Sequence, residues 1–103
     1  MNNAEYVGRF LRVSKIEKNL SEKTLKAYGC DLKAFLAFFK SINIESIGIE
    51  DLRGYLDHLE KGDLKDSTIR RKLATIKVFF SFLEDEGLIE FSPTRKLKKK
   101  FRE

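Results

Sequence analysis

Apolar residues recur at helical spacing in four stretches of the chain, and no stretch alternates between apolar and polar residues as a half-buried strand would. The spacing predicts helices over residues 3–17, 22–40, 49–61 and 67–86. The last of these is apolar nearly all round in its second half, which is typical of a central helix surrounded by several neighbours. At 103 residues, the chain is predicted to be one all-α domain, a compact bundle of four helices.

Residues that commonly begin or end helices flank these stretches. Ser21 can accept a hydrogen bond from a free amide in the first turn of the second helix. Asp66 or Ser67 is expected to cap the fourth helix in the same way. Gly62 and Gly87 follow the third and fourth helices, where glycine favours a helix end.

The net charge of +5 is unevenly distributed along the chain. Residues 92–103 hold six Lys or Arg and one Glu, whereas residues 1–91 hold fifteen basic and fifteen acidic residues. Because Pro93 is expected to end regular structure, we predict a helical domain over residues 1–92 and a basic tail over residues 93–103. Any basic surface on the helical domain must therefore come from local segregation of charge.

Basic residues do segregate on the second and fourth predicted helices. The side of the second helix opposite its apolar stripe carries Lys23, Lys26, Cys30 and Lys33, with Asp31 on its flank. A face of the fourth helix combines basic and small residues, which would allow close approach to a partner: Ser67, Arg70, Ala74, Lys77 and Ser81, with Arg71 at its edge. These faces favour a polyanion, and nucleic acid over membrane, although solvated lysines remain the alternative.

The start of the fourth helix offers a second kind of anion contact. Ser67, Thr68 and the free amides of the first turn could hold a phosphate, with simple capping as the alternative.

Residue types that carry catalysis or bind metals are sparse. His58 is the only histidine and has no partner at metal-ligand spacing, so we expect no metal site. Cys30 is the only cysteine and lacks a nearby histidine, which favours an inert thiol and a reducing cytoplasm. The three tyrosines lie on apolar stripes and are expected in the core. We predict no cofactor, no membrane segment and no enzyme active site in this chain.

The order and spacing of several motif residues resemble the core-binding domain of tyrosine recombinases, the phage-integrase and Xer-type enzymes. The resemblance extends from about residue 3 to residue 95. Two positions depart from the family pattern, because Ser92 stands where Asn is usual and Gly48 where a Thr cap is common. The residues that carry the resemblance are Ser21, Thr24, Tyr28, Asp31, Leu32, Ser67, Arg71, Leu73, Ile76, Gly87 and Pro93.

The resemblance implies a SAM-like four-helix bundle that forms the non-catalytic half of a C-shaped clamp around double-stranded DNA. It implies as partners the catalytic domain of the same parent protein and further recombinase protomers on DNA, with the isolated domain a monomer. The second and fourth helices would face the DNA, and Arg70 or Arg71 would read guanine. The expected DNA contacts are Lys23, Thr24, Lys26, Lys33, Ser67, Thr68, Arg70, Arg71 and Lys77, and in the linker Arg95, Lys96, Lys98, Lys99 and Lys100.

Two other functions fit the same sequence. A SAM-like bundle could be a protein-interaction module that uses exposed residues of the first helix, either Tyr6 and Phe10 or Val7 and Leu11. The chain could also be a free-standing helical regulator that binds DNA without a catalytic domain.

Overall fold

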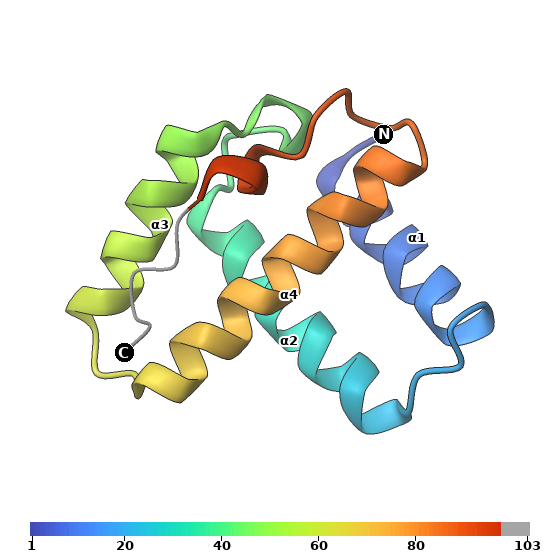
Figure 1. Ribbon diagram of the computed structural model, residues 1–103, viewed down its shortest axis with the longest axis horizontal. Coiled ribbons are helices and arrows are strands. Elements are labelled where there is room, and N and C mark those ends of the chain that lie inside the picture. Colours follow the sequence, from blue (N-terminus) through green and yellow to red (C-terminus); the bar gives the residue numbers. More distant parts are fainter. Residues whose placement is uncertain (98–103) are drawn as a thin grey trace.

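A computed structural model of the protein, in which residues 1–97 are described, consists of helices without strands in that range (Figure 1). The predicted all-α fold is confirmed, and the four predicted helices agree with the observed ones to within two residues at each end. The elements in chain order are α1 (Asn3–Ile16), α2 (Glu22–Phe38), the 3-10 helix η1 (Ile44–Ser46), α3 (Ile49–Lys61), α4 (Asp66–Asp85) and the 3-10 helix η2 (Pro93–Lys96).

Side chains cap the first two helices. The backbone amide of Thr24 donates to Ser21 Oγ at 3.2 Å, which confirms Ser21 as the cap of α2. At the start of α1, Asn2 and Glu5 form a reciprocal pair, in which each side chain accepts from the other residue's backbone amide. Such caps satisfy amide groups that a helix leaves unpaired, and they fix where each helix begins.

The two ends of α4 differ from one another. The prediction that Asp66 or Ser67 caps this helix is wrong, because both lie in its first turn and Lys65 occupies the cap position without a side-chain hydrogen bond. At the other end, Gly87 has a φ of +74°, a left-handed conformation that costs glycine little. Its amide donates to Glu84 O at 3.0 Å, so the predicted stop at Gly87 is confirmed.

Helix α4 lies at the centre of the bundle and packs against α1, α2, α3 and η2. In Figure 1 it crosses α2 near the middle of the molecule. Phe79 packs edge-on against Phe10 of α1 with ring centroids 5.3 Å apart, and Phe80 packs against Phe35 of α2 at 6.0 Å. All four of these phenylalanines are at most 1% exposed. Helix α4 therefore packs against α1 on one side and α2 on another, as its apolar second half predicted.

The buried face of α1 includes residues that one alternative function would need at the surface. Tyr6 and Phe10 are 4% and 1% exposed, so the prediction that this pair forms an exposed protein-binding face is wrong. Val7 and Leu11 are partly buried and pack against the same core. Burial of an amphipathic stripe is the usual way in which a short helix gains stability, which explains why Tyr6 and Phe10 are not left for a partner.

The segment after α4 is more ordered than the sequence predicts. Pro93 does not end regular structure, because η2 begins there and packs against α3 and α4. Leu97 is buried in the core, and Glu84 accepts from the Ser92 amide at 2.9 Å and pairs with Arg95. The division of the chain into a domain over residues 1–92 and a tail stays a prediction.

Candidate functional site

The basic residues predicted on α2 share its exposed side. Lys23, Lys26, Cys30 and Lys33 are all exposed, and we call this set the α2 strip. The buried residues of the same helix lie on other sides and include Leu32 and Phe35, both 0% exposed. The predicted segregation of basic from apolar residues on α2 is therefore confirmed, although exposure alone does not identify a ligand.

A second exposed strip runs along α4 beside its buried residues. It is defined by six residues: Ser67, Arg70, Arg71, Ala74, Lys77 and Ser81. All are exposed except Lys77, which is half-buried. We call this set the α4 strip.

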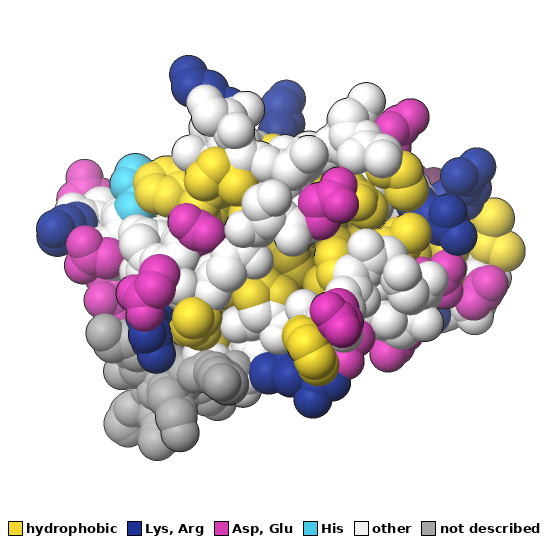
Figure 2. All heavy atoms as spheres, turned by 90° about the horizontal axis from the view of Figure 1, so that it is seen from above, with side chains coloured by type: hydrophobic (Ala, Val, Ile, Leu, Met, Phe, Trp, Pro, Cys, Tyr) yellow, Lys and Arg dark blue, Asp and Glu magenta, His cyan; other side chains and the backbone are white. Residues whose placement is uncertain are grey.

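The amino-terminal halves of α2 and α4 diverge from the point where the helices cross, and both run toward the lower edge of the molecule in Figure 1. Figure 2 looks down on the opposite, upper edge, where Lys and Arg side chains are interspersed with Asp and Glu. The amino-terminal parts of both strips therefore lie toward one end of the bundle, whereas the upper edge carries both signs of charge. This arrangement would offer a polyanion two separate rows of contacts.

A carboxylate buried between the two strips joins α2 to α4. Asp31 is 1% exposed and accepts hydrogen bonds from Arg71, whose Nη2 lies 2.6 Å from Oδ1 and whose Nε lies 3.2 Å from Oδ2. Thr75 Oγ1 donates to Oδ2 at 2.9 Å, and Lys72 Nζ lies 3.4 Å from Oδ1. Asp31 was expected on the flank of the lysine face, and the structure shows that its side chain is buried there. A buried carboxylate requires such partners, because desolvation without them is costly.

The same carboxylate affects its ionisable neighbours. Its hydrogen bonds with Arg71, and then its Coulomb attraction, raise the pKa of the Arg71 guanidinium, with a smaller contribution from Cys30. Burial, and then the charge of Asp31, raises the pKa of Tyr55 in α3 from 10.0 to about 12. Asp31 therefore acts on side chains from both α3 and α4.

The raised pKa of Tyr55 predicts how stability changes in alkali. The folded state favours the neutral phenol, so this contribution is fully present below pH 10 and is lost as the pH rises from 10 toward 12. The Tyr55→Phe variant should lose less stability across that interval than the wild type. Urea unfolding followed by far-UV circular dichroism at pH 8 to 11.5 measures the difference. Parallel declines for the two proteins would contradict the assignment.

The other predicted contact residues differ in how far they are exposed and in whether they are already paired. Thr24 is half-buried, with its hydroxyl 3.1 Å from Ser21 Oγ, and Thr68 is half-buried in the first turn of α4. Arg95 pairs with Glu84, and this pairing raises the pKa of Arg95 and lowers that of Glu84. Arg95, the first of the predicted DNA contacts in the linker, is therefore already paired with a carboxylate of the bundle. Those at Lys98, Lys99 and Lys100 lie outside the described residues, and the side chain of Lys96 is not described.

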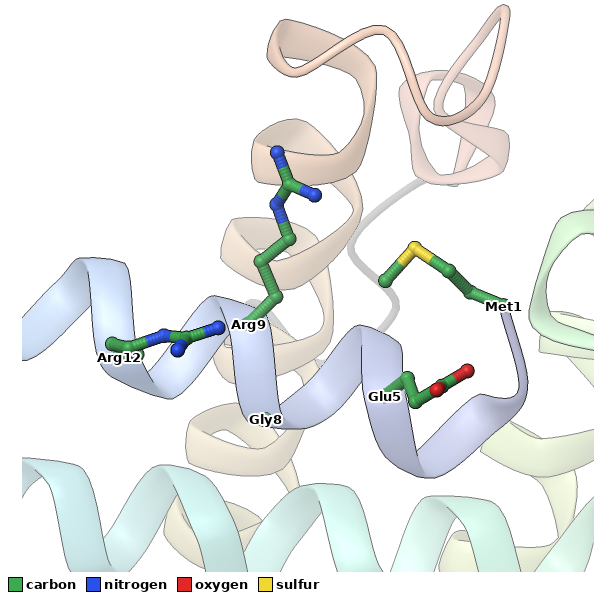
Figure 3. Close-up of a pocket in the computed structure, with 5 residues that line it drawn as sticks. All are labelled: Met1, Glu5, Gly8, Arg9 and Arg12. Carbon is green, nitrogen blue, oxygen red and sulfur yellow. The ribbon is translucent and has the colours of Figure 1, made fainter.

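A groove beside α1 is a further surface feature of the described residues. Figure 3 shows an open groove beside α1, in which Arg9 extends toward the carboxyl-terminal part of α4 and its Nη2 lies 3.3 Å from Glu86 Oε1. Within residues 1–97, no group of His, Cys, Asp and Glu could hold a metal ion. None of the helices described is long and apolar enough to cross a membrane.

The sequence places the bundle in a known family. Its all-helical fold defines a SAM-like helical bundle. Residues 7–87 match the family described as "Phage integrase, N-terminal SAM-like domain", and the chain belongs to this family.

Relatives in several bacteria extend this match to most of the chain. Tyrosine recombinase XerC of Oceanobacillus iheyensis is 36% identical over 90% of this chain and 32% of its own length. Tyrosine recombinase XerC of Thermodesulfovibrio yellowstonii is 38% identical over 91% of this chain and 31% of its own length. A tyrosine recombinase of Agathobacter rectalis is 37% identical over 100% of this chain and 34% of its own length. The chain thus spans about a third of the length of these relatives. No solved structure matches it.

Sequence reasoning missed three residues that organise the site: Asp31 as a buried anion, and Lys72 and Thr75 as its partners on α4. Lys72 is largely buried, with 12% of its side chain exposed, and it lies outside the predicted basic face. The four-residue spacing of Arg71 and Thr75 was a usable signal, because residues at this spacing share one side of a helix. Only the packing of α2 against α4 identifies Asp31 as their common acceptor.

Proposed function

We propose that this chain is the non-catalytic DNA-binding arm of a tyrosine recombinase and clamps the duplex at the recombination core site. The proposal is supported by the family, by the relatives named as tyrosine recombinases and by the two basic strips. It carries with it the partners that such an arm would have: the catalytic domain of the same parent protein, and other recombinase protomers on DNA. It also places the chain in the cytoplasm, as a monomer when isolated.

One observation carries the proposal furthest. Asp31 is the only acidic residue in the segments 23–33 and 67–81, which contain the two strips. It is 1% exposed and is paired with Arg71 and Lys72. The exposed ionic groups of both segments are therefore all positive, which is the surface that a phosphate backbone attracts.

The mechanism that follows is electrostatic docking. Lysine and arginine side chains displace condensed cations from the phosphates, so binding weakens steeply as salt is added. With ~6 phosphate contacts, affinity for a duplex should fall roughly 10³-fold between 50 and 200 mM salt. Small residues in the α4 strip, such as Ala74 and Ser81, leave room for the backbone of the duplex.

The single cysteine provides a direct test of this surface. Cys30 is exposed within the α2 strip, so a bound duplex should shield its thiol from a maleimide reagent. We expect a saturating ~20-base-pair duplex to slow alkylation about fivefold or more at low salt, and added salt to restore the rate. Mass spectrometry of the alkylated fraction over time measures both rates.

The matched control moves the thiol to the upper edge of the molecule. In a Cys30→Ser, Ser46→Cys variant the cysteine occupies an exposed position in η1, which belongs to neither strip. Its alkylation should be unaffected by the duplex. Equal protection of the two thiols, or no protection of Cys30, would reject the proposed binding face.

A further inference from the structure

The orientation of the Arg71 side chain is fixed from within the protein. Its Nε and Nη2 both point to Asp31, at 3.2 and 2.6 Å, so one edge of the planar guanidinium is held by the carboxylate. The side chain is nevertheless 51% exposed. An arginine has five N–H donors in a rigid fork, and the outer edge, which includes both N–H groups of Nη1, is directed away from that carboxylate.

The anchor itself is rigid. Asp31 lies in the middle of α2 and is 0% exposed at its side chain, and Thr75 holds its Oδ2 at 2.9 Å. The hydroxyl of Thr75 also lies 3.1 Å from the Arg71 carbonyl oxygen, within the same turn of α4. Arg71 is therefore fixed through its guanidinium.

The neighbouring Arg70 provides the contrast. It is exposed on the same strip, and no ion pair between described residues includes it. A contact by Arg70 must first restrict several rotatable bonds, whereas Arg71 is already restricted before a ligand arrives. Of the two arginines, Arg71 is the one suited to a contact that depends on geometry.

We propose that Asp31 is a positioning residue for DNA recognition, which acts by holding the outer edge of Arg71 in the orientation needed for a bidentate contact with guanine in the major groove. The proposal rests on the proposed function and adds to it the source of base discrimination. Arginine pairs with the O6 and N7 acceptors of guanine through two N–H donors, so a fixed orientation favours this base. The positive charge of Arg71 is largely cancelled by Asp31, so the pair contributes selectivity more than electrostatic attraction.

This role predicts a result that a purely structural carboxylate would not give. Asp31→Asn removes a negative charge from the basic site, so affinity for an arbitrary duplex should stay the same or rise. The preference for guanine should nevertheless fall about tenfold, because the guanidinium loses its anchor. Arg71→Lys keeps the positive charge but removes the fork, and should lose the preference to the same extent.

The test selects bound molecules from a pool of 20-base-pair duplexes with random sequence and compares the base enrichment of each variant. Arg12→Lys is the matched control, because it makes the same exchange of arginine for lysine at an exposed position on α1, outside both strips. Wild type and Arg12→Lys should enrich guanine at one position at least, and Asp31→Asn and Arg71→Lys should not. Circular dichroism confirms that each variant is helical, and the Arg71 Nε–H signal in NMR should change in Asp31→Asn.

The outcomes separate this inference from the function on which it rests. If Arg71→Lys loses the guanine preference and Asp31→Asn, still helical, keeps it, Asp31 is not a positioning residue. If the wild type binds duplexes without any guanine enrichment, the inference is wrong and the DNA-binding role survives. If the wild type binds no duplex at all, the proposed function itself fails.

Discussion

Replacing Arg71 by glutamate should lower the free energy of unfolding by about 3–5 kcal/mol, because it removes the main partner of a buried charge. The new carboxylate would face Asp31, and Lys72 alone would remain as a cation within reach. A loss of this size is a large part of the total stability of a small domain. Urea unfolding followed by circular dichroism at neutral pH measures it.

The adjacent arginine provides the control for this prediction. Arg70→Glu makes the same change of charge one residue earlier, at an exposed position outside the described ion pairs. Its effect should stay within about 0.5 kcal/mol, as is usual for surface substitutions. Similar losses in both variants would mean that the Asp31 pair contributes no more to stability than any surface charge.

Reversing the charge of two lysines on the α2 strip should have the largest effect on DNA binding. Lys26→Glu combined with Lys33→Glu removes two of the proposed phosphate contacts and adds repulsion, so affinity for a duplex at 150 mM salt should fall roughly 30-fold or more. The slope of log affinity against log salt should become shallower by about 2. Both lysines are exposed, and neither takes part in the described ion pairs, so the fold should be unaffected.

The matched control for this pair places the same charges elsewhere on the molecule. Arg12→Glu combined with Lys40→Glu changes the net charge equally, at exposed positions on α1 and just after α2. Fluorescence anisotropy with a labelled duplex should show little loss of affinity. If both double variants weaken binding alike, net charge alone governs binding and neither strip is the contact surface.

The four main helices could be predicted because each depends on local sequence. The spacing of apolar residues, the Ser21 cap and the Gly87 stop all act within one or two turns, and all agree with the structure. The cap of α4 could not be predicted from residue type, since Asp66 and Ser67 are good capping residues that lie inside the helix instead. A helix can begin a residue or two early when packing against the core stabilises it.

The part of the site that could not be predicted depends on contacts between distant segments. The exposed strips follow from helical periodicity, which is local. The partner of Asp31 is 40 residues away in the sequence, and nothing within α2 indicates that its carboxylate is buried. The ordering of η2 likewise depends on Leu97 reaching the core and on the Glu84 contacts, which join residues on either side of the turn at Gly87.

The position of Leu97 sets the reach of whatever is joined to this domain. If the chain left the bundle at Pro93, the five residues from 93 to 97 could span about 17 Å as part of a flexible connection. Because they form η2 and end in a buried leucine, that length is not available. Whatever part of the chain follows Leu97 therefore starts from a point that is fixed against α3 and α4.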